Sequence, residues 1–469
     1  MNIGIVGLGP MGLGLAHNLS KNNAIVTGWD ISDQVLNGIN RATKDSFLIV
    51  NTMLELIDAV RSPRTILLSI PSGDQVDKII NQLISVLTSN DVVVDCGNSH
   101  FCDTIRREEM LKTKKIGYLG IGFSGGPVGA RNGPAIMAGG NFESWQSHRY
   151  IFELISAKKE GDPCCDYFGS GGAGHFVKMV HNSIEYAIMH LLLESYAFLD
   201  RCFRFSRGQI KEIFNELDSG NSGGYLTNIT MQIVDSKMTD KSDYLIDVVN
   251  PVVGQKGTGK WAIQIALDLD VSVPTLVEAV MLRTLSKNNK LNDSSSVSLK
   301  NENFKKSNKV KFEVIDTLSG ALSIGFASIF EQGLTLLDAS KPALGFSINR
   351  KMAISTWRNG SILQGGMVES IFSIMNSSKN NNKSIMSQII SNLSCDGTTP
   401  LKRLVSEATL AGVPCSGFSS SLAYVESLRG NSLPTELIQM QRDFFGNHGL
   451  LHKETGVPVY APWNTDNST

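Results

Sequence analysis

Close to its start, the chain carries the run Ile3-Gly4-Ile5-Val6-Gly7-Leu8-Gly9-Pro10-Met11-Gly12. Residues 3–6 are mostly apolar and β-prone, which predicts a short buried strand, and a helical pattern begins at Met11. The residues between them match G-x-G-x-x-G in a strand–turn–helix context, which indicates a dinucleotide-binding turn rather than a plain connection. Such glycines permit the tight turn, the close approach of a pyrophosphate and the packing of helix on strand. We therefore expect the cofactor phosphates to bind at this turn, where amides at the start of the helix donate to them. The turn consists of Gly7, Leu8, Gly9, Pro10, Met11 and Gly12.

The end of the second predicted strand, residues 24–29, carries Asp30. Asp30 follows Gly12 at about the 20-residue offset expected of a ribose-binding acid. A carboxylate there accepts hydrogen bonds from a free 2′-hydroxyl and repels a 2′-phosphate, and no Lys or Arg follows until Arg41. The cofactor is therefore NAD or NADP, and Asp30 favours NAD. Two alternatives remain open: Asp30 is a solvated loop acid, or a basic group from elsewhere binds a 2′-phosphate.

Strand and helix signals alternate through the first part of the chain and then give way to helices. Further buried-strand runs occur at 65–70, 91–95 and 116–121, with helix-length segments between them, which predicts a doubly wound parallel sheet. Helical periodicity then dominates at 175–200, 261–269, 273–286 and 314–337. We expect an α/β fold with an N-terminal doubly wound Rossmann-type domain (1–174), a large all-helical domain (175–430) and an extended C-terminal tail (431–469). Two polar stretches, 287–311 and 376–384, are expected to be exposed loops.

Composition excludes several classes of protein. The chain has 469 residues, of which 42% are hydrophobic and 19% charged, with a net charge of −1, so nothing favours nucleic acid or an anionic membrane as partner. The 7 cysteines are scattered and lack the spacing of a zinc site, which indicates reduced thiols. The N-terminus lacks the basic region of a signal peptide, and no uncharged apolar run has the length of a membrane span. We therefore expect a cytoplasmic protein.

The most informative stretch for chemistry is residues 174–186. Four polar residues form a stripe on one face of a helix, because they stand at i, i+3, i+4 and i+7. They are Lys178, His181, Asn182 and Glu185. The other faces are apolar, which indicates a buried helix. A buried Lys and a buried Glu need partners or have shifted pKa values, so they are candidates for a general base and a general acid. Periodicity alone favours a structural Lys–Glu pair equally.

At this stripe the sequence resembles the 6-phosphogluconate dehydrogenase family, and the similarity extends over nearly the whole chain in the family's order. The motifs are Asp95-Cys96-Gly97-Asn98-Ser99 with Asp103-Thr104 and Arg106-Arg107, Ser124-Gly125-Gly126 with Gly129-Ala130-Arg131 and Gly133-Pro134, Gly174 to Asn182 with Ile184-Glu185-Tyr186, Gly254 to Trp261, Trp357-Arg358 with Gly360, and Gln441 to Gly446 with His448. The resemblance implies the decarboxylating dehydrogenase reaction on a phosphorylated sugar acid.

The resemblance also implies a mechanism without a metal ion. Lys178 would be the general base for the C3 hydroxyl and, once protonated, would polarise the resulting ketone, from which carbon dioxide departs. Glu185 would then protonate C1 of the enediol. A Lys that starts neutral and a Glu that starts protonated suit a partly desolvated site.

By the same resemblance, two sets of residues would bind the substrate. Its carboxylate and hydroxyls would meet Asn98 (which would also contact the cofactor), Ser124, Gly125, Gly126, His181 and Asn182. Its phosphate would meet Tyr186, Lys256, Thr258, Arg283, Arg442 and His448, as expected of a dianion that needs several cationic donors. In the family, the tail that carries Arg442 and His448 reaches the partner's active site, which implies a homodimer with shared sites and a dimerising helical domain.

The sequence departs from the family pattern at four places. Trp29-Asp30-Ile31 stands where Asn-Arg-Thr is common, with the Arg binding the 2′-phosphate, which weakens NADP use. Pro127 follows the Ser-Gly-Gly motif where acidic residues are common, Ser183 replaces a glycine, and Gln364 replaces an arginine. None of these changes removes a proposed catalytic group.

Three competing functions are weighed against this one. The stretch from Gly254 to Lys260 approaches a P-loop, but Trp261 replaces the Ser or Thr that would bind Mg²⁺, which excludes it. A β-hydroxy acid dehydrogenase for another small acid is disfavoured by the cationic set Lys256, Arg283 and Arg442. A non-catalytic nucleotide-binding relative is disfavoured by the intact catalytic pair.

Overall fold

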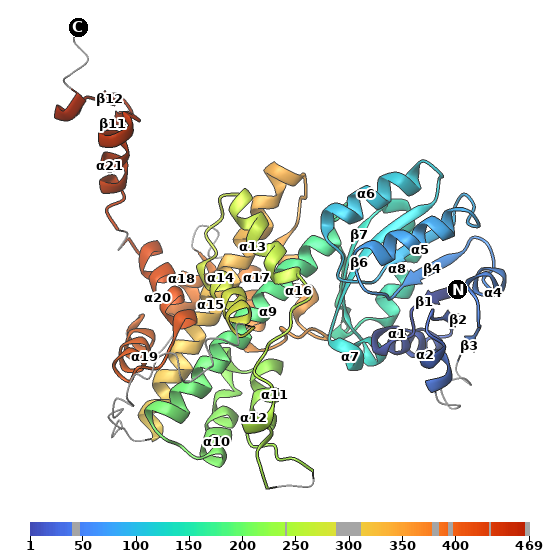
Figure 1. The fold of residues 1–469 in the computed structure, drawn as a ribbon, viewed down its shortest axis with the longest axis horizontal. Helices are drawn as coiled ribbons and strands as arrows, with labels where there is room; N and C mark the ends of the chain where they lie inside the picture. The colour runs from blue at the N-terminus through green and yellow to red at the C-terminus, as the bar shows by residue number, and fades with distance from the viewer. Residues whose placement is uncertain are drawn as a thin grey trace. The chain divides into compact units, whose positions relative to one another are not determined.

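The computed structural model describes residues 1–39, 47–239, 242–287, 311–377, 384–392, 397–430 and 433–464. These residues form two compact units, Met1–Leu422 and Ala423–Thr469, each with its own fold. The first unit begins with an α/β part and continues with a helical part (Figure 1). The fold class predicted from the sequence is therefore confirmed.

An eight-stranded sheet organises the α/β part, in the order β10-β7-β6-β5-β4-β1-β2-β3. The strands from β3 to β6 in this order run parallel, while β7 pairs antiparallel with β6 and parallel with β10. The prediction of a parallel sheet is thus wrong for the pair of β6 and β7, two neighbouring strands that the short helix α7 (Gly126–Asn132) connects. The strands are β1 (Asn2–Val6), β2 (Ile25–Trp29), β3 (Leu48–Ile49), β4 (Thr65–Leu68), β5 (Val92–Asp95), β6 (Gly117–Ser124), β7 (Ala135–Gly140) and β10 (Cys165–Tyr167), and a separate hairpin has β8 (Lys158–Lys159) and β9 (Asp162–Pro163).

Helices cover both faces of this sheet because its strands are apolar on both sides. Leu67 belongs to the cluster that includes Leu15 of α1 and Phe152 of α8, whereas its neighbours in β4, Ile66 and Leu68, belong to the opposite cluster. Fully buried parallel strands of this kind read as continuous apolar runs. The helices are α1 (Pro10–Lys21), α2 (Asp33–Gly38), α4 (Met53–Ala59), α5 (Asp74–Ile84), α6 (Phe101–Lys112), α7 (Gly126–Asn132) and α8 (Phe142–Ile155).

The helical part is built around α9 (Ala173–Ala197), which packs on β6 and β7 and on helices α13, α14 and α15. The predicted boundary at residues 174 and 175 falls in the first turn of this helix. After the π-helical turn η1 (Phe198–Cys202) follow α10 (Arg207–Leu217), η2 (Gly220–Ser222), α11 (Tyr225–Ile233), α12 (Leu245–Val248), α13 (Thr258–Asp268), α14 (Pro274–Leu285), α15 (Lys311–Leu344), α16 (Arg350–Trp357), α17 (Gly366–Asn376), α18 (Ile385–Ser391), α19 (Thr399–Leu410) and α20 (Ser416–Leu428). The predicted loops at 287–311 and 376–384 lie largely outside the described residues.

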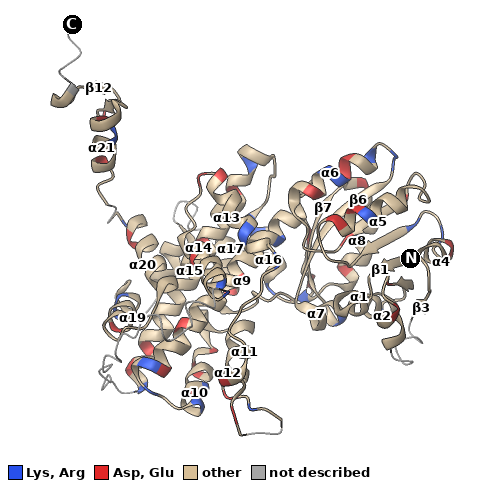
Figure 2. Cartoon of the chain, in the orientation of Figure 1, with Lys and Arg blue, Asp and Glu red and all other residues tan. Residues whose placement is uncertain are grey.

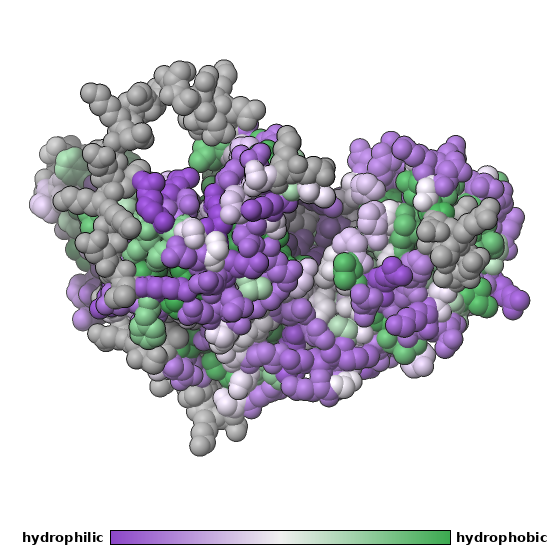
Figure 3. Space-filling view, turned by 90° about the horizontal axis from the view of Figure 1, so that it is seen from below, coloured by the Kyte–Doolittle hydropathy of each residue, from purple (hydrophilic) through white to green (hydrophobic). Residues whose placement is uncertain are grey.

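Among the described helices, the test of length and composition for a membrane-spanning helix is passed by α15. In its most apolar window, 67% of the residues are buried inside the first unit, which is the pattern of a core helix. On the face drawn in Figure 3, hydrophilic side chains predominate and hydrophobic ones are scattered among them.

The second unit is not an extended tail, so this prediction is wrong. It contains α21 (Glu436–Gly446), the hairpin strands β11 (Leu450–Leu451) and β12 (Pro458–Val459), and the short helix η4 (Pro462–Asn464). The buried carboxylate of Asp443 accepts hydrogen bonds from Gly449 N at 2.6 Å and from Trp463 Nε1 at 2.9 Å. These bonds join the hairpin region to the helix, and the aromatic and proline residues of the tail gave no sign of them.

Candidate active site

The helix α9 approaches the sheet closely at its first turns. A Cβ added at Gly174 would lie 2.5 Å from Gly120 O of β6 and from Gly139 N of β7. Only glycine therefore permits this approach. One turn further, Lys178 faces β6, and the predicted stripe is placed against the carboxyl end of the strand that carries Ser124.

Lys178 is 6% exposed, and its aliphatic chain lies along Gly122 of β6. A Cβ at Gly122 would lie 2.6 Å from Lys178 Cγ and closer still to its Cβ, so this position must be glycine. Burial lowers the pKa of Lys178 to about 8, with the charge of Glu185 opposing the shift. Near neutral pH the neutral form of Lys178 is therefore far more populated than that of an ordinary lysine, as a general base requires.

Glu185 lies two turns along the same helix, with 22% of its side chain exposed. Burial raises its pKa above the ordinary value, while Lys178 and Arg283 oppose this shift. Desolvation thus moves the Lys towards its neutral form and the Glu towards its protonated form. Opposite shifts of this kind suit a base and an acid acting in one reaction.

His181 is fully buried between these two residues on α9. Its Nε2 lies 3.0 Å from Ser124 Oγ and 2.8 Å from Ser361 Oγ, and its Nδ1 lies 3.2 Å from Asn182 Oδ1 and 3.9 Å from Glu185 Oε2. Burial, aided by the charge of Lys178, holds the pKa of His181 well below its usual range. The imidazole is therefore neutral at physiological pH.

Asn182 connects the α9 stripe to two other segments predicted to bind substrate. Its Nδ2 donates to Thr258 Oγ1 at 3.3 Å and to Asn98 Oδ1 at 3.5 Å. Thr258 begins α13, and Asn98 lies in the turn that follows β5. The structure thus brings these three residues together with Ser124 and His181.

The predicted phosphate-binding residues are only partly assembled within the first unit. The guanidinium carbon of Arg283 lies 3.6 Å from the centroid of the Tyr186 ring, and its Nη1 donates to Gly254 O at 3.0 Å. Lys256 is exposed in the loop before α13. Arg442 and His448 belong to the second unit, where Arg442 Nη1 donates to Gln439 Oε1 at 3.0 Å.

The glycine turn has the geometry that its sequence predicts. Gly7 has a φ of 94°, and a Cβ there would lie 2.8 Å from the Ile70 side chain. A Cβ at Gly12 would overlap Gly7 O, whereas one at Gly9 would meet nothing within 4 Å. Gly7 and Gly12 therefore allow the turn and the packing. Gly9 faces open space, which a pyrophosphate can approach. The turn suits a dinucleotide.

Asp30 contacts this turn directly. Its Oδ2 accepts Leu8 N at 2.7 Å and its Oδ1 accepts Ser32 N at 2.9 Å. The carboxylate is therefore fixed at the carboxyl end of β2, with further lone pairs for ribose hydroxyls. The next residue, Ile31, is 83% exposed.

A buried charge network supports the turn that carries Asn98. Asp95 accepts hydrogen bonds from Gly97 N at 3.0 Å and Ser99 Oγ at 2.6 Å, and Arg107 Nη1 lies 3.4 Å from its Oδ2. Arg107, fully buried on α6, also binds Asp77 of α5 through Nε and Nη2 and donates to Gly73 O at 3.0 Å. Figure 2 shows basic and acidic residues side by side along α6. The network joins the loops after β4 and β5 at the carboxyl edge of the sheet.

Sequence reasoning missed two residues of this site. Gly122 could have been found, because glycines alternate at positions 120 and 122 of a strand, which is a sign of close backbone approach. Ser361 has no such signal, since it lies far along the chain from His181 and contacts it only through the fold.

Comparisons with known proteins show which family the chain is similar to. Residues 2–169 match the family model for the NAD binding domain of 6-phosphogluconate dehydrogenase, and residues 174–463 match that for the C-terminal domain of 6-phosphogluconate dehydrogenase. The decarboxylating 6-phosphogluconate dehydrogenase of Candida albicans is 34% identical over 451 residues, covering 95% of this chain and 87% of the relative. That of Lactococcus lactis is 32% identical over 470 residues, with 99% of each chain covered. The NADP(+)-dependent, decarboxylating enzyme of Bacillus subtilis is 33% identical over 461 residues, covering 96% of this chain and 98% of the relative.

A solved structure has a similar fold over nearly the whole chain. The Plasmodium falciparum 6-phosphogluconate dehydrogenase, studied in its apo form, with its cofactor NADP+ and with its substrate 6-phosphogluconate, superposes with a TM-score of 0.90 at 29% identity. The match covers 99% of this chain and 100% of that one.

Proposed function

The chain belongs to the 6-phosphogluconate dehydrogenase family, and we propose that it oxidises and decarboxylates 6-phosphogluconate to ribulose 5-phosphate and carbon dioxide. The observation that carries this proposal is the pair on α9, in which burial lowers the pKa of Lys178 and raises that of Glu185. A structural ion pair would favour the charged forms of both residues instead. The intact pair also disfavours a non-catalytic relative.

The chain's own residues supply the proton transfers. The glycine turn from Gly7 to Gly12 and Asp30 would hold a nicotinamide dinucleotide, which would take up the hydride that leaves C3 of the substrate. Neutral Lys178 accepts the proton of the C3 hydroxyl, and the resulting ammonium polarises the C3 carbonyl while the bond to the carboxylate carbon breaks. The Lys178 ammonium gives its proton to the oxygen on the former C3 carbon, which forms the enediol. Protonated Glu185 then donates its proton to C1 of the enediol while that hydroxyl returns its proton to Lys178, which gives the ketone product.

The test is reduction of the nicotinamide, followed by absorbance, with 6-phosphogluconate as substrate. Turnover that disappears in a Lys178→Met variant is expected. Turnover with an unphosphorylated β-hydroxy acid and none with 6-phosphogluconate would favour the other dehydrogenase, and absence of turnover with either would favour a non-catalytic protein.

The fold binds a nicotinamide cofactor, and NAD is the form we propose. Asp30 presents a carboxylate at the end of β2, next to the exposed apolar Ile31, where like charge repels a 2′-phosphate. The Bacillus subtilis relative is NADP(+)-dependent, so the two forms must be compared side by side at equal concentrations. A higher kcat/KM with NAD supports the proposal, and turnover with NADP alone contradicts it.

A homodimer with active sites shared through the tail is the assembly we propose. Exposed apolar side chains on α21 support it: Leu437 is 58% exposed, Ile438 59%, Phe444 69% and Phe445 75%. Such a patch marks an interaction surface. Arg442 and His448 lie in the same segment, so a partner that covers it would receive both.

Mixed dimers test this sharing. Lys178→Met and Arg442→Ala subunits are each expected to be inactive as homodimers. In a heterodimer, one of the two sites combines an intact Lys178 with an intact Arg442. Because random pairing makes about half of the dimers heterodimers, mixing should restore about a quarter of the wild-type activity. No restoration on mixing, with heterodimers demonstrated by mass, would contradict shared sites.

The cytoplasm is the location we propose. Among the described residues, six cysteines are free thiols, and the adjacent Cys164 and Cys165 are both buried. Reduced thiols in this number are typical of a reducing compartment. Fractionation of cells that express the tagged chain is the direct check.

A further inference from the structure

Building on the proposed function, we infer that Ser361 is a positioning residue of the substrate site. Its hydroxyl donates a hydrogen bond to Nε2 of His181, so the hydroxyl of Ser124 is free to donate to the substrate instead. Ser361 directly follows Gly360 of the motif Trp357-Arg358 with Gly360. The proposed function gives this motif no role. Ser361 is 2% exposed.

The backbone around Ser361 is fixed by contacts with the α/β part of the first unit. Gly360 O accepts Ala135 N at 2.9 Å, and Gly360 has a φ of 65°, with a hypothetical Cβ only 2.5 Å from that of Ala157. The Trp357 ring packs edge-on against His181, with centroids 5.6 Å apart. Ser361 therefore reaches His181 from a segment that several contacts besides those of its own hydroxyl hold in place.

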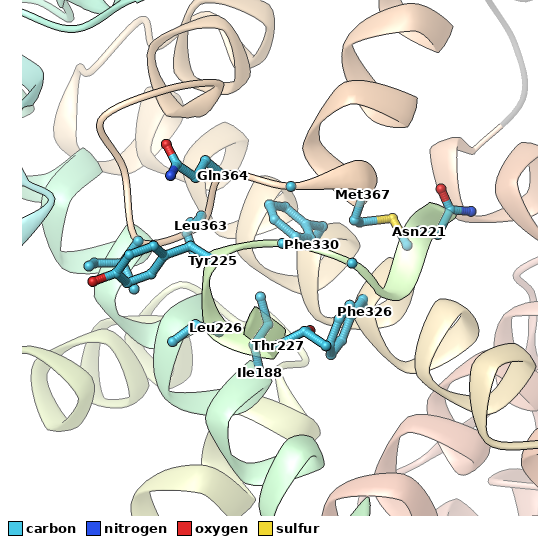
Figure 4. Close-up of a pocket in the computed structure, with 14 residues that line it drawn as sticks. Ile188, Asn221, Tyr225, Leu226, Thr227, Phe326, Phe330, Leu363, Gln364 and Met367 are labelled. Carbon is cyan, nitrogen blue, oxygen red and sulfur yellow. The ribbon is translucent and has the colours of Figure 1, made fainter. Parts of the chain in front are cut away.

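The loop after Ser361 is held equally firmly. Gly224 and Gly365 form an isolated β-bridge, and Gly366 N donates to Gly223 O at 3.0 Å. Gly223, Gly224 and Gly365 also line a small cavity, and Figure 4 shows Phe326, Phe330 and Met367 among the side chains around it. Removing the Ser361 hydroxyl takes away the acceptor of Leu363 N, but these backbone contacts of the loop do not involve that hydroxyl and should remain.

Hydrogen-bond accounting fixes the tautomer of the neutral His181. The Nδ2 group of Asn182 donates to Thr258 and Asn98, so its Oδ1 faces His181 Nδ1 as an acceptor. The imidazole proton therefore lies on Nδ1, and Nε2 offers one lone pair. This places the Nδ1–H on the side of Glu185.

Two hydroxyls compete for that single lone pair. Ser361 Oγ already accepts Leu363 N at 3.0 Å, and Ser124 Oγ already accepts Ile362 N at 3.2 Å, so each has its proton to donate. Ser361 is the nearer to Nε2, at 2.8 Å against 3.0 Å. When Ser361 supplies the bond, the Ser124 proton can turn to a substrate oxygen at the carboxyl end of β6.

The first experiment is a kinetic double-mutant cycle with Ser361→Ala and Ser124→Ala. We expect Ser361→Ala to raise the KM for 6-phosphogluconate about tenfold, the loss of one hydrogen bond, with the KM for the cofactor unchanged. In the Ser124→Ala background it should add nothing to KM, because Ser361 acts through Ser124. Ser195→Ala is the matched control, since this buried α9 serine donates only to Leu191 O. An unchanged KM, or an effect that adds fully to that of Ser124→Ala, overturns the inference.

The second experiment does not require activity. Side-chain ¹⁵N spectra of the full chain, which has 8 histidines, are assigned for His181 by its loss in His181→Gln. We expect a protonated Nδ1 and an unprotonated Nε2, with the Nε2 signal shifted in Ser361→Ala and unshifted in Ser195→Ala. A proton on Nε2 overturns the inference. These spectra retain their meaning if 6-phosphogluconate proves not to be the substrate, so the two proposals can fail separately.

Discussion

Replacing Gly122 by alanine should displace Lys178, the proposed base, without replacing any titratable side chain. The added Cβ would lie 2.6 Å from Lys178 Cγ and closer still to Lys178 Cβ. Ordinary carbon–carbon contacts are about 3.5–4.0 Å, so the lysine must move by about 1 Å or more. Because both atoms lie near rigid backbone in β6 and α9, rotation of the lysine side chain alone cannot relieve the overlap.

A misplacement of about 1 Å costs on the order of 100-fold in rate when the reacting groups must be aligned. We therefore expect kcat to fall about 100-fold in Gly122→Ala, equivalent to about 2.7 kcal/mol, while cofactor binding is retained. The assay is steady-state nicotinamide reduction, with cofactor affinity measured separately by fluorescence titration and folding checked by thermal unfolding.

Gly208→Ala is the matched control for this change. A Cβ at Gly208, in the first turn of α10, meets nothing within 4 Å. The control should keep the wild-type kcat and gain up to about 1 kcal/mol of stability, because alanine favours a helix over glycine. A folded Gly122→Ala enzyme with wild-type kcat would refute the placement of Lys178 against β6.

Three further predictions concern the base, the cofactor and the buried network. Because only the neutral amine of Lys178 accepts a proton, kcat/KM should rise with pH up to about 8 and then level off on this limb; a profile flat from neutral pH to 9 would contradict its role as base. The double change Asp30→Asn with Ile31→Arg should raise kcat/KM with NADP by at least about tenfold, as a charge-assisted bond to the 2′-phosphate allows, and an unchanged cofactor ratio would contradict our assignment of the ribose site. Arg107→Met should cost about 3–5 kcal/mol in urea unfolding, because it removes the buried guanidinium that pairs with Asp77 and with the buried Asp95, whereas Arg149→Ala, at an exposed ion pair, should cost less than about 1 kcal/mol; equal costs would argue against the network.

The fold class and the shared helix face of Lys178 and Glu185 were accessible from local sequence patterns. The spacing of Gly7, Gly9 and Gly12 specifies a turn whose geometry depends on adjacent residues, and the structure has the φ and the close contacts that it requires. The spacing of Lys178 and Glu185 places them on one face because an α-helix has a fixed period. In both cases the information is local, so the sequence expresses it directly.

Periodicity alone could not distinguish a structural ion pair from a base and an acid at Lys178 and Glu185. That distinction depends on how much water reaches the two groups, and burial is a property of the assembled helices and sheet. The family motifs favoured catalysis before the burial was known. The shifted pKa values of both residues then supply the physical reason.

Only the tertiary structure decided which residues hold the stripe in position. Gly122 acts through the packing of β6 on α9, and Ser361 reaches His181 from a segment 180 positions away. The antiparallel pairing of β7 and the bonds of Asp443 in the tail likewise join residues whose local sequence shows no preference for them. Periodicity and short motifs record only the conformation of neighbours in the chain, whereas these contacts are selected by the shape and the hydrogen-bonding needs of surfaces that exist only after folding.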